Sequence, residues 1–303
     1  MAKVLIIGVD GAIGRAVAQG LCARADEVIG TSRRSHPDGR GLAGARISLD
    51  LASPDAVETD LPDVDFVIFC AAMARYADCR QQPDLARTVN VTVPAALARR
   101  LVERGAHAIL LSTSAVFDCQ SPLVPADRKQ SPKSAYGVLK ADAEIEFLAL
   151  GRRASILRLT KVITPGLPLF VNWIDALARG QHVRAFADLS FCPVAIGDAV
   201  RAIVAVVDDA SGGIYQASGG EDISYLDAAR HLALRLDVPP GLVEATRAVD
   251  HGIPETEVAR YTSLDASRLT ALAKWQPPNA VDVLDSVFGP VLRSKKFGIA
   301  QAS

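Results

Sequence analysis

Short apolar runs and amphipathic segments alternate along the first 160 residues of the chain. The apolar runs predict buried strands, and the segments with an apolar residue every three or four positions predict helices. Strands buried on both faces belong to parallel sheets covered by helices, so the pattern predicts an α/β fold with a Rossmann-type doubly wound parallel sheet. The expected strands are 3–7, 27–31, 45–49, 65–70, 108–111 and 154–159, and the expected helices are 13–24, 84–104 and 134–150.

This alternation ends after Thr160. The remaining chain contains more proline and glycine, and apolar periodicity predicts only three clear helices, near 171–178, 225–236 and 281–292. We therefore expect a dinucleotide-binding domain at 1–160, to which 191–220 returns. The segments 161–190 and 221–303 are expected to form a smaller, C-terminal substrate-capping domain.

The composition is that of a globular chain without a strong charge. Half of the 303 residues are hydrophobic and 22% are charged. Lysine and arginine number 33 against 34 aspartates and glutamates, so the formal net charge is −1 and no overall field attracts nucleic acid or a membrane. No apolar run approaches the roughly 20 residues of a membrane span, and the N-terminal run is too short for a signal peptide. We expect a soluble, cytoplasmic protein whose partner is a small molecule.

The cysteines and histidines show no pattern typical of a disulfide framework or a metal site. The five cysteines are scattered without a CxxC pair, and the five histidines lack ligand spacing. We expect no metal, and we expect the histidines to be structural or on the surface. The cysteines are Cys22, Cys70, Cys79, Cys119 and Cys192, of which the first two lie in apolar runs and are expected in the core.

Three glycines, Gly8, Gly11 and Gly14, follow the first strand and open the first helix, which is the context of a dinucleotide-binding loop. Small residues there let the backbone approach a pyrophosphate, and the N–H groups of Ala12 and Ile13 at the helix start can bind it. A plain turn between strand and helix is the alternative. Asp10 within this loop would repel phosphate unless its side chain points to solvent.

The end of the second strand selects between nicotinamide cofactors. An acid there would bind the ribose hydroxyls of NAD, but the chain has Thr31-Ser32-Arg33-Arg34 instead. An arginine suits the 2′-phosphate of NADP through charge-assisted hydrogen bonds. We therefore expect Ser32 and Arg33 to bind NADP, with NAD possible. A solvated basic turn is the alternative, for Arg34 in particular.

Tyr136 and Lys140 lie one helical turn apart and would project from the same helix face. A cation beside a phenol favours the phenolate, so we expect Lys140 and a cationic nicotinamide ring together to lower the pKa of Tyr136 toward neutrality. Upstream, Thr113 follows a strand and could hydrogen-bond a reacting carbonyl. Each feature also occurs by chance, as a helix face or an N-cap. Their order along the chain predicts a nicotinamide-dependent oxidoreductase with catalytic Thr113, Tyr136 and Lys140.

With these motifs in view, the chain resembles the extended short-chain dehydrogenases/reductases of the NAD-dependent epimerase/dehydratase superfamily. It is most similar to their dTDP-4-dehydrorhamnose reductase and sugar-nucleotide-binding branch. The resemblance implies that Asp50 and Leu51 contact adenine, that Ala71 and Ala72 line the cofactor, and that Asn90 is a structural support. Further matching segments are Ser112–Phe117, Leu157–Leu159, Asn172-Trp173, Pro193–Asp198 and Thr262–Asp265.

The family resemblance implies reduction of a carbonyl on a nucleotide-linked keto sugar, with NADPH as hydride donor and Tyr136 as proton donor. Lys140 would also bind the nicotinamide ribose, and homodimers are frequent in this family. The loops 73–82, 118–130 and 161–190 would enclose the substrate. The implied substrate contacts are Met73, Ser114, Asn172 and Trp173.

Two departures from the family patterns keep other interpretations open. The reductases usually carry Asp-Tyr where this chain has Ser114-Ala115, so the substrate is unspecified and could be another small carbonyl or alcohol. The epimerases usually carry Arg-Asp-Phe where this chain has Leu189-Ser190-Phe191. An NAD-dependent epimerase or dehydratase and a non-catalytic NADP-binding regulatory protein remain as alternatives.

Overall fold

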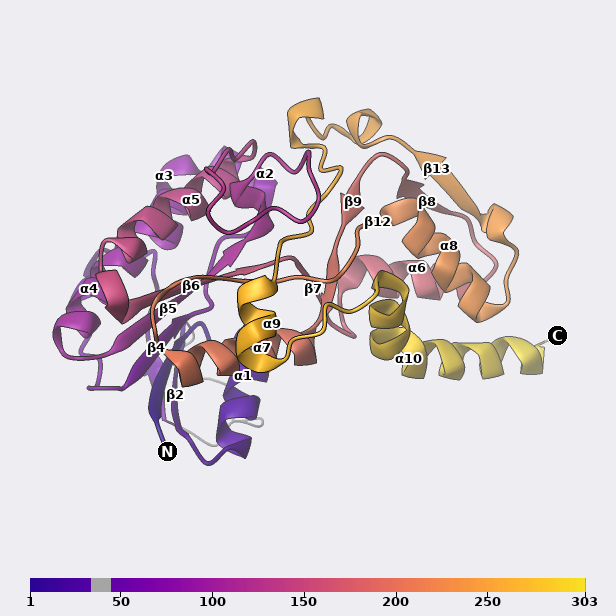
Figure 1. The fold of residues 1–303 in the computed structure, drawn as a ribbon. Helices are drawn as coiled ribbons and strands as arrows, with labels where there is room; N and C mark the ends of the chain where they lie inside the picture. The colour runs from indigo at the N-terminus through magenta and orange to yellow at the C-terminus, as the bar shows by residue number, and fades with distance from the viewer. Residues whose placement is uncertain (34–44, 303) are drawn as a thin grey trace.

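A seven-stranded parallel sheet is the centre of the computed structural model, which describes residues 1–33 and 45–302 (Figure 1). The strands lie in the order β3-β2-β1-β4-β5-β6-β11, which confirms the expected doubly wound Rossmann-type fold. The strand order reverses at β1, so the carboxyl ends of β1 and β4 flank the crevice where such sheets bind ligands. The strands are β1 Lys3–Ile7, β2 Glu27–Ser32, β3 Arg46–Ser48, β4 Phe66–Phe69, β5 His107–Thr113, β6 Ala154–Leu159 and β11 Gly213–Ala217.

Consecutive side chains of the central strands enter two different apolar cores. Leu5 and Ile7 pack against one helical layer, whereas Val4 and Ile6 pack against the other. The two-residue repeat of a strand causes this alternation, and it requires strands that are apolar throughout. We call the sheet and its two layers the larger unit. The first layer contains α4 Val93–Glu103 and α5 Ala135–Leu148, and the second contains α1 Ala12–Ala23, α7 Ile196–Asp209 and α9 Ser267–Ala273.

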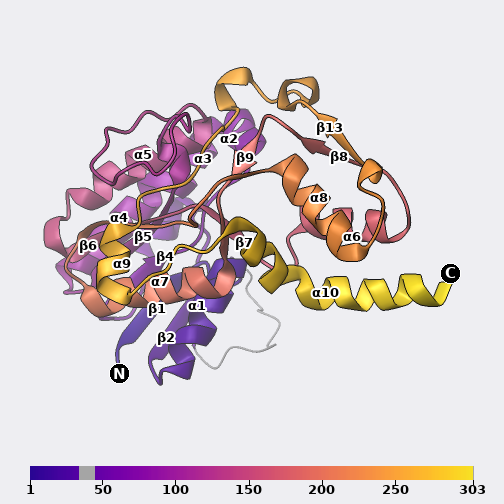
Figure 2. The same cartoon turned by 45° about the vertical axis from the view of Figure 1, so that its right-hand side comes forward.

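A third apolar core forms a smaller unit beside the sheet, on the right of Figure 1. The rings of Phe170, Trp173, Phe191 and Phe288 meet in it. The last helix continues past this core and projects from the body (Figure 2), but in the described ranges no helix is long and apolar enough to cross a bilayer. The elements are α6 Pro168–Ala178, β8 Val183–Phe186, β9 Ser190–Phe191, β12 Ile223–Ser224, α8 Tyr225–Leu236, β13 Val243–Thr246 and α10 Ala280–Ala302.

The chain passes between the two units more often than the sequence predicts. Between them, β7 Lys161–Ile163 pairs with β10 Pro193–Ala195, and α7 and β11 then lie in the larger unit. A second return is not predicted by the sequence. Ala266, Leu269 and Trp275 pack in the second core of the larger unit, although the sequence pattern places 221–303 in the smaller domain.

The helix expected at 84–104 is interrupted. After α2 Tyr76–Gln81 and α3 Pro83–Arg87, a π-helical turn at Thr88–Thr92 precedes α4. Pro94 offers no N–H to the carbonyl of Asn90 and its ring crowds that carbonyl, a conflict that a wider turn relieves. The π-turn places Asn90 where its side chain can support the loop after β4.

Candidate active site

The backbone of the glycine loop leaves no room for side chains at two of its three glycines. Gly8 has a φ of +91°, and a Cβ there would lie 2.7 Å from the Cβ of Ala71. A Cβ on Gly14 would lie 2.3 Å from the carbonyl oxygen of Gly8. Gly11 caps α1 without a side-chain hydrogen bond, so the first N–H groups of the helix, including those of Ala12, are open to a ligand. This geometry fits a pyrophosphate.

The side chain of Asp10 is turned toward the end of β2. Its carboxylate accepts hydrogen bonds from the Ser32 hydroxyl and, at 2.8 Å, from Nη1 of Arg46 on β3. The Asp10 side chain is 35% exposed, and the Arg46 guanidinium balances its charge, so solvent is not the only group that screens this acid from a phosphate. Arg33 is exposed beside this group. The expected alternative role of Arg34 lies outside the described residues.

The segment after β4 is fixed by Asn90, which is buried. Its Oδ1 accepts from the N–H of Met73 at 2.9 Å, and its Nδ2 donates to the carbonyl of the same residue at 3.0 Å. Ala71 donates its N–H to the carbonyl of Ile7 at 2.9 Å, which brings this segment next to the glycine loop. Ala71, Ala72 and Met73 thus lie along the crevice. The role of Asn90 as a structural support agrees with these contacts.

The expected adenine contacts differ in exposure. Asp50 is exposed and accepts from the N–H of Ala52 at 3.0 Å, whereas Leu51 is buried in the first core of the larger unit. An interaction of either residue with adenine remains a prediction. The described residues include no group of three or more His, Cys, Asp or Glu side chains placed to bind a metal ion.

Thr113 and Tyr136 lie in segments that pack directly on each other. The Thr113 hydroxyl, at the end of β5, accepts from the N–H of Ala115 at 3.2 Å, which leaves its own proton available to a ligand. Helix α5 begins after Ser134, whose hydroxyl accepts from the N–H of Gly137 at 3.0 Å. A Cβ on Gly137 would lie 2.2 Å from the carbonyl oxygen of Ala115. Only glycine permits this approach, which brings the start of α5 against the loop after β5.

Lys140 is buried, with 3% of its surface exposed. Burial lowers its pKa to about 8, while the negative charge of Glu144 and the nearby Cys70 oppose that effect. Lys140 therefore keeps its charge at neutral pH but loses it at moderately alkaline pH. The proximity to Cys70 places the lysine near the carboxyl end of β4, beside the crevice.

The pKa of Tyr136 is raised, and burial is the main cause, followed by Tyr76 and Cys79. The expected lowering of this pKa is thus wrong for the protein by itself. Burial removes hydration from the charged phenolate, and Tyr76 and Cys79 disfavour that charged form further. A protonated phenol is nevertheless the form that donates a proton.

Tyr76 is a site residue that the sequence analysis missed. Its ring stacks on that of Tyr136, with centroids 5.7 Å apart and an angle of 29° between the planes. Its helix, α2, is tied to the loop after β13 by an ion pair of 2.7 Å between Arg80 and Glu257. These partners are 177 positions apart, so no local pattern could have indicated their contact.

The expected substrate contacts on α6 have different surroundings. The Trp173 ring is buried and packs edge-on against Phe170 and Tyr225, with centroids 5.5 and 6.3 Å apart. Asn172 is exposed on the same helix. Ser114 is buried and directly follows Thr113.

Comparisons with known proteins agree with this architecture. Residues 2–288 match the family model described as RmlD substrate binding domain. The chain is 28% identical over 284 residues to a dTDP-4-dehydrorhamnose reductase of Mycolicibacterium smegmatis, covering 90% of this chain and 83% of that protein. It is 26% identical over 309 residues to methionine adenosyltransferase 2 subunit beta of Xenopus laevis, covering 97% and 90%. A dTDP-4-dehydrorhamnose reductase structure from Bacillus anthracis, in complex with NADP, has a TM-score of 0.80 at 19% identity, covering 95% and 99%, which shows the fold alone.

Proposed function

Because the chain belongs to the RmlD substrate binding domain family, we propose that it is an NAD(P)-dependent oxidoreductase that reduces the carbonyl of a nucleotide-linked 4-keto sugar. The observation that carries this proposal is the packing of Gly137 on Ala115, which joins Tyr136 and Lys140 to the strand end that bears Thr113. The relatives named dTDP-4-dehydrorhamnose reductase support the reaction and the substrate class.

The residues at the crevice fit a dinucleotide. The backbone of Gly8, Gly11 and Gly14, with the N–H groups of Ala12 and Ile13, would bind the pyrophosphate. Ser32 and Arg33 would bind the adenosine ribose and its 2′-phosphate. Ala71 and Ala72 would line the cofactor, and Asp50 and Leu51 would approach the adenine. When bound, a reduced nicotinamide supplies the hydride.

Three side chains perform the remaining chemistry. The Thr113 hydroxyl donates a hydrogen bond to the substrate carbonyl oxygen and polarises it, while the hydroxyl oxygen itself accepts from the N–H of Ala115. Tyr136 gives its phenolic proton to the same oxygen as negative charge develops there. Its raised pKa ensures that the phenol carries this proton before reaction. Lys140 stabilises the resulting phenolate and binds the nicotinamide ribose.

The smaller unit would complete the substrate site. We assign substrate binding to Met73, Ser114, Asn172 and Trp173, with Tyr76 as a further contact because of its stacking on Tyr136. Residues 1–160 and 191–220 form the cofactor-binding domain in this proposal, and the smaller unit closes over the sugar. The ion pair between Arg80 and Glu257 links the two sides of the proposed substrate site.

The decisive experiment combines cofactor titration with turnover of dTDP-4-dehydrorhamnose. We expect NADPH to bind more tightly than NADH, and Tyr136→Phe to reduce kcat at least about 10³-fold while the Kd for NADPH changes less than about twofold. Tyr261→Phe, at an exposed tyrosine, is the control and should leave both values unchanged. Binding of neither cofactor, or full activity of Tyr136→Phe, would contradict the proposal.

The similarity to a protein named as a subunit of methionine adenosyltransferase favours a second candidate, a non-catalytic cofactor-binding subunit. It predicts NADPH binding without turnover of any carbonyl substrate. An epimerase or dehydratase would instead retain tightly bound NAD during purification. The same titration and activity measurements therefore separate the three functions.

A further inference from the structure

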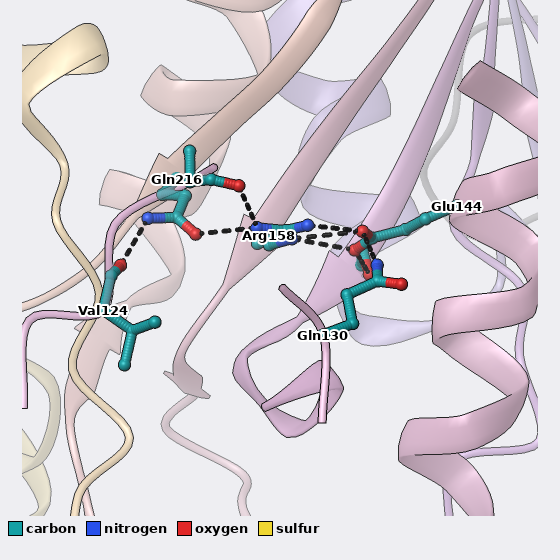
Figure 3. Close-up of polar contacts among 7 residues, drawn as sticks. Val124, Gln130, Glu144, Arg158 and Gln216 are labelled. Carbon is teal, nitrogen blue, oxygen red and sulfur yellow. Dashed lines mark hydrogen bonds and ion pairs between the residues drawn. The ribbon is translucent and has the colours of Figure 1, made fainter. Parts of the chain in front are cut away.

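A buried ion pair lies behind the catalytic helix. Glu144 on α5 and Arg158 on β6 are 0% and 1% exposed. Nη2 of Arg158 donates to Oε2 of Glu144 at 2.7 Å, and its Nε donates to Oε1 and Oε2 at 3.0 and 3.2 Å. Figure 3 shows the guanidinium aligned with the carboxylate, with further polar groups on both sides. All the hydrogen-bonding capacity of the carboxylate is directed into the protein.

The carboxylate connects the two elements that carry the catalytic side chains. Glu144 lies one helical turn after Lys140 and two turns after Tyr136, on the same face of α5. It also accepts a hydrogen bond from the hydroxyl of Ser112, the residue immediately before Thr113 on β5. A single carboxylate thus links the helix of Tyr136 and Lys140 to the strand that ends at Thr113.

The guanidinium connects this pair to the remaining parts of the site. Arg158 donates to the carbonyl of Ala126 at 3.0 Å and to Oε1 of Gln216 on β11 at 3.2 Å. Nε2 of Gln216 donates in turn to the carbonyls of Val124 and Asp265, both at 2.9 Å. The same network therefore fixes the loop after β5, as Figure 3 shows, and the segment before α9.

Stability alone does not account for such a pair. Removing two charges from water costs several kcal/mol per ion, and well-packed apolar residues of similar volume are often as stable or more so. The pair does, however, restrict several elements to one arrangement, and its location is directly behind the catalytic side chains. We propose that Glu144, held by Arg158, is a positioning residue that fixes the Tyr136–Lys140 helix against the Thr113 strand.

The position of Glu144 one helical turn from Lys140 has a further consequence for the charge of the lysine. Tyr136 and Glu144 flank it on α5, Cys70 faces it from the end of β4, and Arg158 lies on β6 beyond Glu144. Glu144 is the negative charge that opposes the effect of burial. Neutralising it would lower the pKa of Lys140 further, so the lysine would lose its proton at a lower pH and stop stabilising the phenolate.

The test compares charge removal at Glu144 with charge removal elsewhere on α5. Glu144→Gln preserves shape but leaves Arg158 unpaired, whereas Glu144→Gln combined with Arg158→Met removes both charges and avoids an unpaired buried ion. Glu146→Gln is the control, because Glu146 forms an exposed ion pair of 3.4 Å with Arg99 and lies on the same helix as Glu144. NMR of protein labelled with carbon-13 at the lysine ε position follows the titration of Lys140. Its signal is assigned as the one that disappears in Lys140→Met.

The kinetic part of this proposal rests on the proposed function. The titration of Lys140 can be measured without any substrate. We expect Lys140 to titrate near about 8 in the unmodified protein and in Glu146→Gln, and at lower pH in both Glu144 variants. We also expect kcat in the folded double variant to fall about tenfold, with the KM for NADPH changed less than about twofold. A folded double variant with unchanged Lys140 titration and kcat would overturn the proposal. Absence of turnover in the unmodified protein would contradict the proposed function only, and the titration would still decide the role of Glu144.

Discussion

The glycine loop and the core of the smaller unit are built in different ways. In the loop, Gly14 brings its backbone so close to Gly8 that a single added carbon would overlap the carbonyl oxygen. In the smaller unit, Phe170 packs against Phe191 and Phe288, from segments far apart in the sequence. The loop depends on local backbone geometry and the core on distant side chains. A substitution in the aromatic core should therefore lower stability with little effect on the loop, and a substitution in the loop should change ligand binding with little effect on the core.

Phe170→Ala should have the largest effect, and mainly on stability. The ring is fully buried among three aromatic side chains, and its removal leaves a cavity that costs about 3–5 kcal/mol. Urea denaturation should show this loss, while the folded protein should bind NADPH with a Kd within about twofold of its original value. Leu169→Ala, at the exposed neighbouring position, is the control. Loss of cofactor affinity in the folded protein would show that the two regions are coupled.

Gly14→Ala should have the opposite profile. The new Cβ would force the loop away from α1, so we expect NADPH affinity to fall about 100-fold, equivalent to about 2.7 kcal/mol. Gly197→Ala is a matched control, because Gly197 also lies in the first turn of a helix but a Cβ there meets nothing within 4 Å. Calorimetric titration measures both variants. Equal affinities would mean that the loop does not bind the pyrophosphate.

Asp10→Asn should change the choice of cofactor without impairing binding. The carboxylate neutralises Arg46 on β3, and the amide would release that guanidinium for a 2′-phosphate. We expect the ratio of NADPH to NADH affinity to rise about tenfold, equivalent to about 1.4 kcal/mol. Asp55→Asn, at an exposed acid outside the proposed cofactor contacts, should leave the ratio unchanged. An unaltered ratio in Asp10→Asn would place the phosphate elsewhere.

Arg80→Gln should have the smallest effect, since it removes one partly exposed ion pair between α2 and Glu257. Such pairs contribute about 0.2–1 kcal/mol. We expect an increase in the KM for the sugar of about twofold and no change in the Kd for NADPH. Arg75→Gln, at a more exposed side chain with a 3.8 Å pair to Asp78, is the control. An effect on NADPH binding would show that this contact also influences the cofactor side.

Local patterns account for what the sequence predicted well. The two-residue and 3.6-residue repeats identify β1, α1 and β6 nearly to the residue, and the spacing of Tyr136 and Lys140 identifies α5. These features depend on neighbours within one or two turns. The requirement for glycine at position 14 belongs to the same class, because the obstructing carbonyl of Gly8 lies in the same loop, whereas a side chain at Gly8 would meet the distant Ala71.

Long-range contacts account for what the sequence did not predict. The pairing of Asp10 with Arg46 depends on how β3 joins the sheet, and the stacking of Tyr76 on Tyr136 depends on how α2 approaches α5. The raised pKa of Tyr136 follows from burial, which no motif reports. The second return of the chain to the larger unit, where Trp275 packs in the second core, depends in the same way on distant partners.

The position of α9 limits how this protein can be recombined with its relatives. Trp275 donates its indole N–H to the carbonyl of Ser218 at 3.2 Å. Leu269 packs in the same apolar core as the side chains of β1. In a chimera with a single junction near residue 160, Leu269 and Trp275 would be replaced by the relative's residues. The core of the larger unit would then contain side chains that did not evolve with it. A graft that replaces the smaller unit with that of a relative should therefore keep residues 264–275 of the host chain. The transplanted segments would end before residue 264 and resume after residue 275.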